Sequence, residues 1–155
     1  MSPPDVARVS QLADGALAAL LRPYGLALRW LAPDERIEGS YWGESEAGLV
    51  GDVLVLRPDT PVHSALHEAG HFICADSGRR AALHTDAGGD DLEECAVCYL
   101  QIELAARLPG YSRERVLADM DAWGYSFRLG AARAWFERDA GDARAWLVQR
   151  GLLPA

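Results

Sequence analysis

The chain has 155 residues, half of them hydrophobic, which is enough for one ordinary globular domain that folds without disulfide or metal staples. Its formal net charge is −8 at pH 7, and all 15 basic residues are arginine, so chemistry that depends on lysine is excluded. The acidic balance also argues against nucleic-acid and anionic-membrane partners, because both need clustered positive charge.

Targeting signals and cysteine usage both favour a cytoplasmic protein. No apolar run is long enough to span a membrane, and the first residues lack the basic and apolar regions of a signal peptide. The three cysteines, Cys74, Cys95 and Cys98, are an odd number and do not make a disulfide framework. In the simplest interpretation they are reduced, small buried hydrophobes.

The first half of the chain is predicted to contain one helix and a small sheet. Hydrophobic periodicity predicts a helix over residues 5–21, ended by Pro23-Tyr24-Gly25. Three short apolar segments then predict strands, at 26–31, 37–42 and 49–56. The last two are expected to pair antiparallel, because a short loop joins them.

The rest of the chain is predicted to be helical. A helix follows the strands, with Pro61 in its first turn, a cap from Asp59 or Thr60, and an end at Ser77-Gly78. Further helices are expected at 90–108, from Ser112 to Gly124, at 127–138 and at 141–150. The fold class is therefore α+β, with a mostly antiparallel sheet of about three strands and a helical C-terminal half.

Residues 67–71 read His-Glu-Ala-Gly-His, and this string carries most of the functional information. In a helix, His67 and His71 leave the same face about 6 Å apart along the axis, which suits two ligands of one zinc ion. Glu68 is rotated by about 100° and would reach a water on the open side of the metal, where a carboxylate acts as general base. His63 lies one turn earlier, too far along the axis for the same tetrahedral ion, and is expected at the surface.

A catalytic zinc ion takes a third protein ligand, and the acidic start of the next predicted helix, residues 90–94, is the richest source. The helical face of Glu93 is otherwise apolar, which suits packing beside the site, because it continues with Ala96, Val97 and Leu100. Glu93 is therefore the preferred third ligand.

Glu94 is the alternative, on a face that continues with Val97, Cys98 and Gln101. The glutamate that does not bind the metal would orient a ligand histidine through its second ring nitrogen. Asp90, Asp91 and the cysteines are further candidates.

Cys95 and Cys98 raise a competing interpretation. Two histidines at i, i+4 together with a C-x-x-C pair make the ligand count of a closed, structural zinc site. Such a site does no chemistry and would leave Glu68 without a role. Both pairs are predicted inside helices, whereas structural sites usually draw a cysteine pair from a tight turn, so the catalytic interpretation is preferred.

The motif resembles the gluzincin branch of the zincin metallopeptidases, in which H-E-x-x-H on one helix is completed by a glutamate from a second helix. Within that branch, Glu93-x-x-Ala96-x-x-Tyr99 is similar to the signature that follows H-E-x-G-H in the small bacterial ImmA/IrrE-type proteases. The resemblance implies a zincin-like fold in which His67, His71 and Glu93 bind Zn²⁺ and Glu68 activates water. No sensor or DNA-binding domain is expected within these 155 residues, so the resemblance does not strongly imply repressor cleavage.

Together these observations predict a single zincin-like domain over residues 1–155 that hydrolyses peptide bonds in a peptide or protein substrate. The alternative is a zincin-like metal-binding or protein-interaction domain without turnover, including a structural zinc site that uses Cys95 and Cys98. In zincins a strand beside the site commonly holds an extended substrate by edge pairing. Residues 37–42 or 51–56 are expected to take that part.

Overall fold

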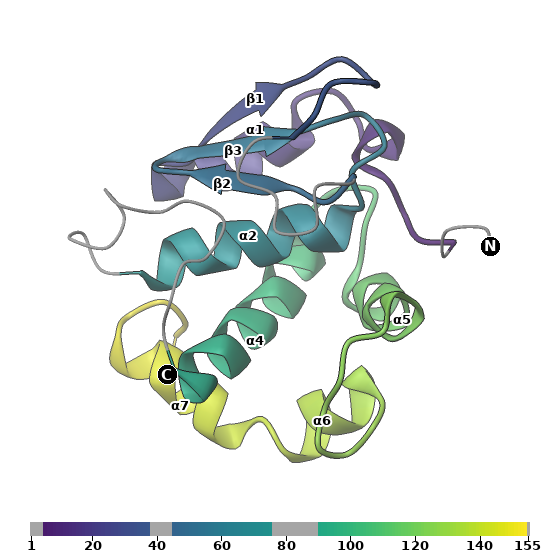
Figure 1. Ribbon diagram of the computed structural model, residues 1–155. Helices are drawn as coiled ribbons and strands as arrows, with labels where there is room; N and C mark the ends of the chain where they lie inside the picture. Colours follow the sequence, from purple (N-terminus) through teal and green to yellow (C-terminus); the bar gives the residue numbers. More distant parts are fainter. Residues whose placement is uncertain (1–4, 38–44, 76–89, 155) are drawn as a thin grey trace.

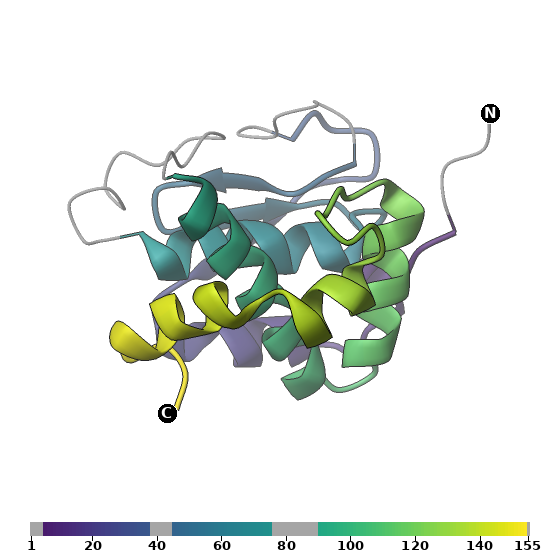
Figure 2. The ribbon, with the colours of Figure 1, turned by 90° about the horizontal axis from the view of Figure 1, so that it is seen from below.

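Figure 1 shows the computed structural model of the chain, which describes residues 5–37, 45–75 and 90–154. The fold class is α+β, as predicted. A three-stranded sheet lies on helix α2 (Val62–Cys74), and helix α4 (Asp91–Arg107) packs against α2 on the side away from the sheet (Figure 1). Seen from below, α4 crosses α2 and is surrounded by the C-terminal helices α5 (Arg113–Trp123), α6 (Ala132–Arg138) and α7 (Gly141–Gln149) (Figure 2).

The sheet is mixed rather than mostly antiparallel. Its strand order is β1-β3-β2, with β1 (Ala27–Trp30) parallel to β3 (Val53–Leu56) and β2 (Gly48–Val50) antiparallel to β3. The predicted strand over 49–56 is wrong as one strand, because Gly51 and Asp52 form a two-residue hairpin turn within it and Gly51 has a φ of 59°. The strand predicted over 37–42 lies, apart from Ile37, outside the described residues.

The helix predicted over residues 5–21 is broken in two. A short 3₁₀ turn, η1 (Val9–Gln11), is followed by α1 (Ala16–Leu21) and a second 3₁₀ turn, η2 (Arg22–Tyr24). Gly15 at the start of α1 has a φ of 79°, a left-handed conformation that interrupts a helix. Asp14-Gly15 in the sequence was the local signal for this break.

Helix α2 lies between the sheet and α4, so most of its side chains are buried. Pro61 precedes the first helical residue, and the Thr60 hydroxyl accepts a hydrogen bond from the Arg57 amide instead of capping α2. The Ser64 hydroxyl accepts a 2.9 Å hydrogen bond from the Ala47 amide, which joins α2 to the start of β2. The helix ends at Cys74, whereas Ser77 and Gly78, the predicted stop, lie outside the described residues.

Helix α4 approaches α2 closely because residue 70 has no side chain. A Cβ atom at Gly70 would lie 3.0 Å from Cγ1 and 3.3 Å from the carbonyl oxygen of Val97. The start of α4 is well defined, since the Asp90 carboxylate accepts a 2.8 Å hydrogen bond from the Glu93 amide. The sequence predicted both the position of this helix and its acidic first turn.

The C-terminal helices complete the core around α4. Ser112 caps α5 through a hydrogen bond from the Arg115 amide, as expected, while α6 begins at Ala132, later than the predicted 127. Large side chains from these helices, including Leu117, Met120, Trp135 and Leu147, are buried against α4 and its neighbours. In the described part of the chain, none of the helices combines the length and apolar character that crossing a membrane requires.

Candidate metal centre

The two histidines of the sequence motif face a single carboxylate across the α2–α4 contact. His67 Nε2 lies 3.0 Å from Oε1 of Glu94, and His71 Nε2 lies 3.1 Å from Oε2 of the same residue. The imidazole side chains are only 16% and 13% exposed, whereas that of Glu94 is 49% exposed. The cluster therefore has mostly buried imidazoles on α2 and opens to solvent at Glu94.

The two candidates for the third ligand differ in where they lie. Glu94 contacts both histidines, while the preferred candidate, Glu93, projects about 100° away around α4 and is buried at 5% exposure. The apolar face used to favour Glu93 is indeed buried, since Ala96, Val97 and Leu100 are in the core. The carboxylate that contacts the histidines, that of Glu94, lies at the edge of this apolar face and not within it.

Glu68 lies in the same helix turn as His67, and its Oε2 atom is buried without a hydrogen-bond partner among the described residues. Burial raises the pKa of Glu68, and the negative charges of Glu94 and Glu46 act in the same direction against the opposing effect of the two histidines. A carboxylate with a raised pKa is a stronger base than an exposed glutamate. Glu68 therefore has the basicity expected of a proton acceptor beside the cluster.

Gln101 fixes the orientation of the His67 ring. Its amide nitrogen donates a 2.7 Å hydrogen bond to the carbonyl oxygen of His63 and lies 3.2 Å from the Tyr125 hydroxyl. The amide oxygen is thereby turned toward His67, where it lies 3.1 Å from Nδ1. Because an amide oxygen only accepts, Nδ1 of His67 carries a proton and Nε2 is the nitrogen aimed at Glu94.

The sequence analysis predicts this orienting role for a glutamate and does not single out Gln101. Its one signal was a polar residue on the otherwise buried side of α4, where it has 0% exposure. Buried polar groups need partners, and Gln101 meets that need by joining α2 to the loop that follows α5.

His63 is buried, not at the surface as predicted. It is 1% exposed, its Nδ1 lies 3.0 Å from the Tyr125 hydroxyl, and its ring packs against Trp123. Burial lowers the pKa of His63 to about 3, with a further contribution from the nearby His67. His63 is therefore a neutral histidine within the packing that supports His67.

The electrostatics of the cluster favour an ionised carboxylate between the two imidazoles. Burial acts to raise the pKa of Glu94, but the hydrogen bonds from His67 and His71 outweigh it and hold that pKa far below its usual range. Burial likewise acts to lower the pKa of His67, and Tyr125, Cys98 and Glu94 together outweigh it, so that this pKa is raised. Negative charge on α4 and positive charge on α2 thus stabilise each other.

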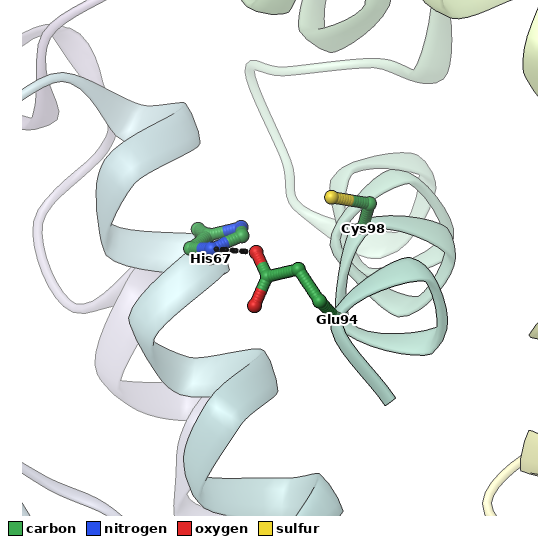
Figure 3. Close-up of side chains that lie close together, drawn as sticks. All are labelled: His67, Glu94 and Cys98. Atoms are coloured by element: carbon green, nitrogen blue, oxygen red, sulfur yellow. Dashed lines mark ion pairs between the residues drawn. The ribbon is translucent and has the colours of Figure 1, made fainter. Parts of the chain in front are cut away.

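Cys98 belongs to the same cluster. It lies one turn after Glu94 on α4, and the donor atoms of His67, Glu94 and Cys98 all lie within 4.8 Å of one another. Figure 3 shows Glu94 and Cys98 projecting from α4 toward His67 on α2. The other cysteine of the C-x-x-C pair, Cys95, lines a separate surface hollow with Leu92, Phe127 and Trp135.

Comparison of the chain with protein-family models, curated proteins and solved structures found no match. The geometry and chemistry of this cluster are therefore the basis for assigning a function.

Proposed function

We propose that the protein is a zinc-dependent metallopeptidase with a zincin-like site. In this proposal His67, His71 and Glu94 bind Zn²⁺, and Glu68 is the general base. Glu94 takes the ligand position that the resemblance to gluzincins would assign to Glu93. The observation that carries the proposal is the approach of both Nε2 atoms to one carboxylate, at 3.0 and 3.1 Å, from two different helices.

The donor set fits zinc. Two imidazole nitrogens and one carboxylate are a common ligand set of catalytic zinc ions, which keep a further position for water or substrate. Gln101 holds the proton of His67 on Nδ1 and leaves Nε2 to serve as the ligand atom. A bound zinc ion would lower the pKa of a water molecule and stabilise negative charge on a peptide carbonyl oxygen.

Glu68 supplies the proton transfer that peptide hydrolysis needs. Its buried Oε2 lacks a hydrogen-bond donor among the described residues, and a water molecule beside the histidine pair would provide one. Glu68 would accept the proton of the attacking water and pass it to the amine that leaves. The raised pKa of Glu68 supports both transfers, because a general acid or base works best when its pKa lies near the working pH.

An extended peptide is the substrate class that the surrounding fold favours. β2 is an edge strand whose one partner in the described chain is β3, and it lies directly over α2 (Figure 1). Glu46, two residues before β2, is near enough to influence the pKa of Glu68. An extended chain added beside β2 would therefore pass the base. Residues 51–56 cannot take this part, because β3 has neighbours on both sides.

The alternative, a metal site without turnover, is favoured by the position of Cys98 beside His67 and Glu94. Its form with both cysteines as ligands is less well supported, because Cys95 lines a different hollow.

The decisive experiment is Glu68→Gln, which keeps the shape of the side chain and removes the base. We expect the variant to retain one equivalent of zinc, measured by elemental analysis, and to lose peptide hydrolysis by a factor of about 10²–10⁴. Hydrolysis is followed with a quenched-fluorescent library of random peptides. Equal cleavage by the variant and the wild-type protein would overturn the mechanism.

A further inference from the structure

The two helices at the site present matching pairs of donors. His67 and His71 are four residues apart on α2, and Glu94 and Cys98 are four residues apart on α4. Residues with this spacing lie one above the other on one face of a helix. The contact between α2 and α4 therefore brings both imidazoles to Glu94 and brings the Cys98 thiol to His67 and Glu94.

The distances place the Cys98 thiol within reach of the same ion. Bond lengths of about 2.0 Å to nitrogen or oxygen and 2.3 Å to sulfur put the donors of a tetrahedral zinc site about 3.3–3.6 Å apart. The donor atoms of His67, Glu94 and Cys98 lie within 4.8 Å of one another. Side-chain adjustments of about 1.5 Å are enough to close that difference.

Position and burial together separate Cys98 from the other two cysteines. Cys98 is 6% exposed and points into the α2–α4 contact, as Figure 3 shows. Cys95 is partly exposed beside Trp135. Cys74 is buried like Cys98 but is the last residue of α2, outside the cluster of His67, Glu94 and Cys98. A closed site with two cysteines is thus disfavoured, but a site with one is not.

We propose that Cys98 is a fourth protein ligand, so that the resting protein holds zinc in a closed His₂-Glu-Cys site. This inference rests on the proposed metal centre and adds regulation to it. A thiolate in the fourth position excludes the water that Glu68 would activate, and hydrolysis requires the thiolate to leave the metal. The thiolate thereby limits hydrolysis in the resting protein to the fraction of molecules in which Cys98 has left the metal.

Cobalt substitution tests the proposal, because a cobalt–thiolate bond has an intense near-ultraviolet charge-transfer band that nitrogen and oxygen ligands lack. The wild-type protein and four variants, C98S, C98A, C95S and C74S, are each loaded with one equivalent of Co²⁺. We expect the band in the wild-type protein, C95S and C74S, and its loss in C98S and C98A with cobalt still bound. Cys95 is the matched control, since it lies on the same helix outside the cluster.

Three results would overturn the inference in distinguishable ways. Stoichiometric cobalt without a thiolate band in the wild-type protein removes Cys98 from the ligands and leaves the proposed function intact. Loss of the band in C95S or C74S, but not in C98S, assigns the thiolate to another cysteine. Absence of bound cobalt in both the wild-type protein and C98S overturns the metal centre as well.

The regulatory part has its own readout. With zinc bound, C98A is expected to hydrolyse the peptide library faster than the wild-type protein, whereas C98A combined with E68Q stays inactive. A C98A variant that binds zinc and is no faster than the wild-type protein contradicts the closed resting state.

Discussion

The contact between α2 and α4 has an apolar part and a polar part with different physical requirements. In the apolar part, Gly70 lets α4 approach until Val97 fills the space that a Cβ would occupy. In the polar part, His67 and His71 face Glu94. The other ring nitrogen of His67, Nδ1, forms a hydrogen bond with Gln101. Close packing has no direction of its own, whereas hydrogen bonds and metal ligands tolerate only small errors in distance and angle.

The apolar part of the contact positions the side chains of the polar part. The rotation of α4 about its axis decides which of two consecutive glutamates meets the histidines, and that rotation follows from the burial of Ala96, Val97 and Leu100. Changes in the polar part are therefore expected to alter metal binding with little effect on the fold, and changes in the apolar part to alter both.

The largest effect is expected from Glu94→Gln, which removes a carboxylate ligand from the polar part. Loss of a direct ligand should weaken zinc binding by more than about 100-fold, beyond the usual range for an outer partner. Competition with a chromophoric chelator measures the affinity. Glu93→Gln is the matched control, with the same chemical change one position away, and its affinity is expected to stay near that of the wild-type protein. The reverse order would restore Glu93 as the ligand.

Gln101→Leu tests the hydrogen bond that orients the His67 ring. The change keeps a side chain of similar size but removes the oxygen that accepts from Nδ1, so the ring loses its preferred orientation. Zinc affinity should fall by about 10–100-fold, as for other partners of metal-bound histidines. Gln101→Glu keeps an acceptor facing His67 but loses the donor to the His63 carbonyl oxygen, so it should recover only part of the affinity. If both variants lose affinity equally, the role of Gln101 is only in packing.

Gly70→Ala probes the apolar part. Alanine favours a helix over glycine by about 1 kcal/mol, so an uncrowded site would gain stability. Here the new Cβ would meet Val97 at 3.0 Å, and we expect the overpacking to lower the free energy of unfolding by about 1–3 kcal/mol and to weaken zinc binding. Urea denaturation measures the first effect. Val97→Ala in the same chain should relieve the crowding, and a stabilised Gly70→Ala single variant would contradict the tight contact.

The smallest effect is the pH dependence contributed by His63 in the metal-free protein. Its pKa is lowered to about 3 in the folded state, so between pH 6.5 and 3 the unfolded chain binds a proton there that the folded chain does not. Stability from this group is therefore present above pH 6.5 and lost as the pH falls, by at most about 1.4 kcal/mol per pH unit. His63→Phe should remove that slope from unfolding curves measured at pH 5 to 7. An unchanged slope would mean that His63 does not titrate as described.

Local features of the chain were enough to predict the helices that carry the site. The four-residue spacing of His67 and His71 makes them neighbours in any helix, whatever packs against it. Asp90 marked the start of α4 because its carboxylate satisfies an amide that the helix leaves unpaired. Such interactions act over a few residues, so their outcome is readable from the sequence.

The tertiary structure decided what those helices face. Glu94 contacts both histidines and Cys98 lies beside His67, because the rotation of α4 depends on all of its contacts at once. The same holds for the parallel pairing of β1 with β3, which joins segments far apart in the chain, and for His63, whose burial comes from Trp123 and Tyr125. Residues distant in sequence supply these contacts, and no local periodicity contains that information.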